Sequence, residues 1–192
     1  STEGNSGALY LGTGTGVTGT GGAVYVTVGS GNSGVGGELV LSAGTTTSAD
    51  GTGGHVLLQT GYSTKTTSGS LQLMTADGGL TGGVSGLIVL STGSSTTGDS
   101  GALYLGSGTG VGGSGGAVFV TVGSGNSGVG GELVLSAGVT SSAAKAGGHV
   151  MLQTGYSEQS TSGDLQLMTA NGGKLGSSGF VVLSTGATSS GD

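Results

Sequence analysis

Residues 6–44 read SGALYLGTGTGVTGTGGAVYVTVGSGNSGVGGELVLSAG, and almost the same stretch returns as residues 100–138. The two copies are 94 residues apart, so Glu38 corresponds to Glu132 and His55 to His149. Inside each copy a shorter unit, Gly-x-(Leu/Val)-x-(Leu/Val)-x-x-(Gly/Ala), recurs every 15–17 residues. Self-similarity at a short period predicts a stacked repeat architecture. We therefore expect residues 1–98 and 99–192 to be two repeats of one continuous solenoid.

Each unit carries two large aliphatic residues spaced by two, such as Leu9 and Leu11. This spacing predicts a β-strand with both side chains on one face. The residue two positions further on, such as Thr13, has the same parity, and a closing glycine or alanine ends the unit. The expected fold class is all-β, a parallel β-solenoid. Twelve units align on their leading glycines, which are Gly7, Gly22, Gly37, Gly54, Gly69, Gly86, Gly101, Gly116, Gly131, Gly148, Gly163 and Gly179.

The units alternate in their core residues. Odd units contain Leu-x-Leu, whereas even units begin with Val or Ile, and the longest connections follow odd units. The alternation predicts a coil of two strands and about 31 residues, repeated in roughly six coils, with Leu strands in one sheet and Val-type strands in another. A coil of a single unit of 15–17 residues is the alternative. Only that alternative places Glu38 beside His55 as a cross-strand pair.

The composition excludes several functional classes. The chain has 50 glycines in 192 residues, no proline and no cysteine, and a net charge of −6. Three lysines without arginine neutralise few phosphates, so we expect neither a nucleic-acid partner nor a membrane partner. The lack of cysteine excludes disulfides and thiolate metal sites. Low charge and a high Gly, Ser and Thr content favour an extracellular or cell-surface location, while the fixed apolar positions argue against disorder.

Two strings imitate functional motifs. GSGNSG at 29–34 fits the dinucleotide-binding pattern, but the chain is a quarter glycine and no helix follows. GDSG at 98–101 matches the surroundings of a serine nucleophile, but the only histidines are the repeat-related His55 and His149. Aspartates are too sparse for a calcium-binding roll. The sequence therefore predicts no catalytic residue, cofactor or metal site, and no enzyme.

The residue between the two core aliphatics faces outward, and in even units it is apolar throughout. A strand that is apolar on both faces is usually buried on both faces, so this row predicts a lateral interface. Ordinary β-formers left exposed on an elongated protein are the alternative interpretation. The predicted interface residues are Tyr25, Leu57, Val89, Phe119, Met151 and Val182.

Over its whole length the pattern resembles the Gly/Ser/Thr-rich β-solenoid arrays of secreted adhesins and extracellular fibre proteins. The resemblance is one of architecture and composition, and it assigns no functional residues. It implies a structural protein that self-assembles into a filament or surface array. Neither end shows a polar cap, so we expect end-to-end stacking of copies, with lateral association through the even units. The alternatives are an ice-binding solenoid and an adhesin stalk that binds glycans through Tyr62 and Tyr156.

Overall fold

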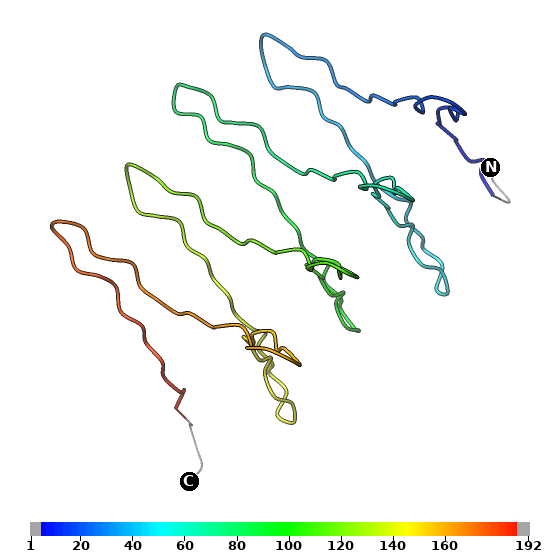
Figure 1. Cartoon of the computed structure of the whole chain (residues 1–192). Coiled ribbons are helices and arrows are strands. Elements are labelled where there is room, and N and C mark those ends of the chain that lie inside the picture. Colours follow the sequence, from blue (N-terminus) through cyan, green and yellow to red (C-terminus); the bar gives the residue numbers. More distant parts are fainter. Residues whose placement is uncertain (1–4, 188–192) are drawn as a thin grey trace. The chain divides into compact units, whose positions relative to one another are not determined.

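The computed structural model describes residues 5–187 and divides the chain into two halves, Ser1–Gly93 and Ser94–Asp192. Within residues 5–187 there is no helix and no paired strand. Each half is a succession of extended segments that correspond to the units, joined by arcs of Gly, Ser and Thr (Figure 1). Across the same residues, no helix is long and apolar enough to cross a membrane.

The described residues include no buried side chain, apolar or polar. Extended segments that do not pair leave their backbone groups and both of their faces in water, and even an isolated pair of strands is marginally stable. The parallel β-solenoid, which needs lateral pairing between coils, therefore stays a prediction. What the structure defines is how each unit is joined to the next.

Backbone hydrogen bonds close several arcs into narrow necks. In each of these necks the leading glycine of one unit donates its N–H to the carbonyl of the closing glycine of the preceding unit. The same bond recurs at equivalent places in the two halves, so the arcs follow the 94-residue repeat. The bonds run from Gly54 to Gly44 (2.8 Å), Gly148 to Gly138 (2.9 Å), Gly69 to Gly61 (3.0 Å) and Gly163 to Gly155 (3.0 Å).

Two further necks are closed by side-chain hydroxyls. Thr13 Oγ1 donates to the carbonyl oxygen of Gly22 at 2.9 Å, and Ser107 Oγ donates to that of Gly116 at 2.6 Å. Thr13 and Ser107 are repeat-related, and so are Gly22 and Gly116. A hydroxyl two positions after the second core aliphatic thus replaces the backbone bond that closes other arcs.

At two leading glycines a side chain of the preceding unit already fills the space that a Cβ would need. A Cβ added at Gly37 would lie 2.6 Å from Cγ1 of Val28, and one at Gly131 would lie 2.6 Å from Cγ1 of Val122. Real Cβ atoms do not approach a neighbour this closely, so sterics and not backbone dihedrals select glycine here. Five of the described residues are less exposed than the others, and all but Gly78 lie in necks. They are Ala43, Thr60, Gly78, Ala137 and Thr154.

One class of arc in the described chain, called an open reversal here, turns the chain without a hydrogen bond between the residue that ends one unit and the leading glycine of the next. In the first half, such reversals occur in arcs 30–36 and 77–85, which follow the second and fifth units (Figure 1). Gly34 has φ 90° and Gly82 has φ 89°, a left-handed conformation that glycine adopts without a steric penalty. The second half repeats the feature in the arc after its second unit, where Gly128 has φ 109°.

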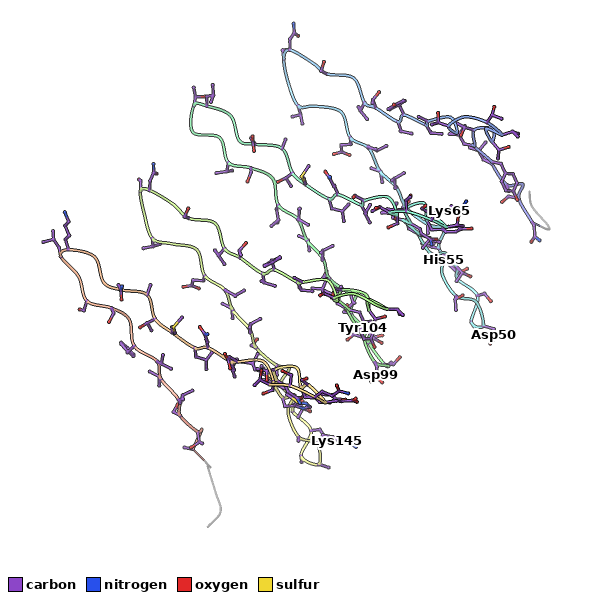
Figure 2. All side chains as sticks on the ribbon, viewed as in Figure 1. Asp50, His55, Lys65, Asp99, Tyr104 and Lys145 are labelled. Atoms are coloured by element: carbon purple, nitrogen blue, oxygen red, sulfur yellow. The ribbon has the colours of Figure 1, made fainter. Side chains whose placement is uncertain are left out.

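The other arcs of the first half lie at the opposite end of the trace, as the labelled Asp50 and Lys65 show (Figure 2). Asp50 belongs to the arc between Gly44 and Gly54, and Lys65 belongs to the arc between Gly61 and Gly69. The first half therefore returns to an open reversal after three units.

Hydroxyl-based turns inside the arcs also recur at the repeat spacing. Thr46 Oγ1 accepts from the Ser48 N–H at 3.2 Å, and Thr140 Oγ1 accepts from the Ser142 N–H at 3.1 Å. Short hydroxyl side chains mimic a backbone turn in this way, which explains why Ser and Thr fill arcs that lack proline. A second pair of such turns is formed by Ser63 with the Thr66 N–H (2.9 Å) and Ser157 with the Ser160 N–H (3.0 Å).

A methyl group at a crowded neck should destabilise the protein. We expect Gly37→Ala to lower the free energy of unfolding by about 1–3 kcal/mol, because its Cβ overlaps Val28. Urea denaturation followed by circular dichroism measures the change. Gly36→Ala is the matched control, since a Cβ there meets nothing within 4 Å. Adding Val28→Ala to Gly37→Ala should recover part of the loss in stability. Equal effects of Gly36→Ala and Gly37→Ala would contradict the close contact between Gly37 and Val28.

Removing a hydroxyl that closes a neck should lower the free energy of unfolding by a smaller amount. Thr13→Val keeps the side-chain shape but removes the donor to Gly22, and we expect a loss of about 0.5–1.5 kcal/mol in the free energy of unfolding. Thr18→Val, in the middle of the same arc, is the control. No difference between the two variants in urea denaturation would show that the hydrogen bond from Thr13 to Gly22 does not contribute to stability.

Candidate self-association surface

In several units the inward residues are less exposed than their outward neighbours. Val24 is 54% exposed and the neighbouring Tyr25 is 87% exposed; in the second half Val118 is 58% and Phe119 is 86% exposed. The inward aliphatics are partly covered because each neck folds the end of one unit against the start of the next. The outward residues receive no such cover, so they form the surface that is available to a partner.

The predicted interface residues are all exposed. Leu57, Val89, Met151 and Val182 are exposed like the two aromatic residues of the row, and none of the six lies in a neck. The structure shows one such residue on every second unit and does not bring the six together. Their common interface stays a prediction.

The units also contain a second outward row, which the alternation of odd and even units does not predict. Every third unit has Val between its core aliphatics and Ser two positions later, as in Val40 with Ser42 and Val89 with Ser91. The four valines are all exposed. The signal that finds this row is the spacing of the leading glycines: Gly7, Gly54, Gly101 and Gly148 are 47 residues apart, as are Gly22, Gly69, Gly116 and Gly163.

The charged and aromatic candidates lie in solvent. His55 and His149 follow leading glycines on outward positions, and Glu38 and Glu132 do the same on other units. Among the described residues, no three His, Asp or Glu side chains gather in a way that could hold a metal ion. Tyr62 and Tyr156 directly follow closing glycines and are 86% and 82% exposed.

An open hollow lies over Leu183, Ser184 and Thr185 near the end of the described chain. Its lining offers two hydroxyls and one apolar side chain, a set that supplies neither an acid, a base nor a nucleophile activated by one. The outward rows of side chains are therefore the surface that can recognise a partner.

Comparison of this chain with protein-family models, with curated proteins and with solved structures finds no match.

Proposed function

We propose that this chain is a structural protein of the cell exterior that self-assembles, through stacked β-solenoid coils, into a filament or surface array. The single observation that carries the proposal is the exposure of the large apolar side chains of the described residues on regularly repeated segments. Such a surface has to be covered, and the repeats supply identical segments that can cover one another.

The size of the exposed area favours extensive stacking of coils and argues against a single small interface. The chain exposes 19296 Å². A folded monomer of this size exposes about 8,000 Å², and a standard protein interface buries about 1,600 Å² in total. One interface of standard size therefore covers only a small part of the difference. Coil-on-coil pairing covers the inward aliphatics and the backbone groups together, whether the coils belong to one chain or to neighbouring copies.

Repetition also supports a structural role over catalysis. Equivalent outward residues return at the 94-residue spacing, and so do the hydrogen bonds of the necks and arcs. A repeated surface provides many equal sites of weak association, as in filaments and arrays. Catalysis instead needs one preorganised cluster of unlike groups.

The ice-binding alternative is disfavoured by the position of the threonines. Thr13, Thr60 and Thr154 lie in necks against the next leading glycine, so they do not form a free flat ladder. A thermal-hysteresis measurement tests this alternative, and clear activity would favour it. Glycan binding rests on the exposed Tyr62 and Tyr156, and a glycan array with a Tyr62→Ala and Tyr156→Ala variant tests it.

The direct test is the size and form of the purified protein. We expect sedimentation velocity to show association that increases with concentration, and electron microscopy to show filaments or sheets. Because the covered surface is apolar, sodium sulfate should strengthen association, whereas sodium chloride should change it little. A stable monomer at high concentration, with and without sulfate, would refute self-assembly.

A further inference from the structure

The leading glycines divide the units into three classes that repeat in order. First-class units begin at Gly7, Gly54, Gly101 and Gly148, and second-class units at Gly22, Gly69, Gly116 and Gly163, each set with a constant spacing of 47 residues. Third-class units follow the second class and begin at Gly37, Gly86, Gly131 and Gly179. The 94-residue repeat therefore contains two rounds of three units.

Arc lengths support this grouping. The arc after each first-class unit has the same length throughout, as at 15–21 and 62–68. The third-class units shift by one or two residues, and in the first half the arcs on their two sides compensate for a shift of two. In the first round the arc before the unit is short (30–36) and the arc after it is long (45–53), and in the second round the order is reversed (77–85, then 94–100). Compensation of this kind keeps the length of one closed round constant.

The path of the chain agrees with the grouping. The open reversals of the first half both follow second-class units (Figure 1). The neck bonds at Gly69 and Gly163 follow first-class units and those at Gly54 and Gly148 follow third-class units, whereas none of the described neck bonds follows a second-class unit. A coil of three units places all arcs that follow second-class units at one corner, whereas a coil of two units would divide them between two corners.

From these observations we infer that three consecutive units form one coil of 47 residues, and that its third-class face binds the first-class face of a second copy. The inference rests on the proposed function, because it specifies which surfaces associate. It replaces the two-unit coil, since in a three-unit coil the apolar row of the even units is divided among three faces.

The third-class face is the most regular of the three. Its units all place Val at the centre and Ser two positions later. Stacked at about 4.8 Å per coil, these residues form one β-branched stripe beside one hydroxyl stripe. The first-class face carries Tyr or a long aliphatic at the same central position, as in Tyr10 and Leu57. Large side chains on one face and short ones on the other suit the packing of two sheets.

The outward residues next to the leading glycines are complementary between these two faces. On the first-class face they alternate between Ala and His, as Ala8 and His55. On the third-class face they alternate between Glu and a large apolar residue, as Glu38 and Leu87. When the second copy is reversed end to end and the coils are in register, each imidazole meets a carboxylate and each alanine meets a large apolar residue. The pairs are Ala8 with Phe180, His55 with Glu132, Ala102 with Leu87 and His149 with Glu38.

The direction of the partners follows from the geometry. For these residues to meet, the facing strands must run in the same direction. Two coils of one handedness present parallel strands to each other only when their long axes are antiparallel. The second copy is therefore expected to lie alongside with its axis reversed, its first-class face on the third-class face.

Disulfide cross-linking tests the size of the coil, because the natural chain contains no cysteine. The Ser42→Cys/Ser91→Cys variant joins third-class units of successive rounds, and in a three-unit coil its Cα atoms lie within the 4.4–6.8 Å range of a disulfide. Ser42→Cys/Met74→Cys tests the two-unit coil and Ser42→Cys/Gln59→Cys the one-unit coil. Each variant is oxidised in an excess of unmodified protein, and mass spectrometry identifies cross-links within one chain.

We expect most molecules of the first variant to cross-link and few of the other two. A predominant Ser42→Cys/Met74→Cys or Ser42→Cys/Gln59→Cys cross-link would overturn the three-unit coil while leaving self-assembly standing. Absence of all three cross-links would overturn the coil inference and also remove the solenoid from the proposed function.

Charge exchange tests the pairing of faces. The variant His55→Glu/His149→Glu makes the first-class face acidic, and Glu38→Lys/Glu132→Lys makes the third-class face basic. Each variant alone should associate several-fold more weakly than the natural protein in sedimentation velocity, because its facing residues repel or lose their hydrogen bonds. An equal mixture should regain association, since the acidic face of one variant now meets the basic face of the other.

Glu158→Lys, which changes a charge in an arc, is the control and should not alter association. Weaker association of both variants without recovery in the mixture would overturn the pairing, and so would variants that associate like the natural protein. Failure of the natural protein itself to associate would instead refute the proposed function. The two failures are therefore distinguishable.

Discussion

The contact between a leading glycine and the end of the preceding unit, which recurs along the chain, is the constraint on which the rest of this structure depends. At Gly37 and Gly131 the available space is too small for a Cβ atom because Val28 and Val122 occupy it. Backbone bonds at Gly54 and Gly69 and hydroxyl bonds at Gly22 and Gly116 hold the same junction elsewhere. Glycine at this place allows many of the arcs to close on themselves, which sets where the following extended segment begins and which side chains it turns inward.

Much of the local organisation could be predicted from the sequence. The leading glycines mark the junctions at which the structure forms its necks, and the alternation of Val24 and Tyr25 predicts which of the two is less exposed. These properties depend on residues within one unit or one arc. The pairing of coils depends on contacts between segments that are far apart in the chain, and local patterns do not determine it. Strand pairing accordingly remains a prediction.

The size of the coil stays a prediction, and two patterns in the sequence favour different sizes. The alternation of Leu and Val between successive units is real, and it suggests a period of two. The positions of Gly7, Gly54 and Gly101, and the compensating arcs around the third-class units, instead indicate a period of three. The arc lengths are the better guide, because a closed coil must return to its starting point, whereas either aliphatic side chain can fill a thin core. The predicted interface of the even units rests on the alternation of Leu and Val. The row that contains Val40 and Val89 rests on the period of three units.

The necks also bear on how the chain folds. The residues that close an arc lie about ten positions apart or fewer, and loops of this length close in roughly 10–100 ns, far faster than distant strands find one another. Closing each arc requires no information from the rest of the chain. A newly made molecule can therefore form its string of closed arcs before any coil stacks on another, so that the slow, concentration-dependent step is left to the pairing of prepared segments.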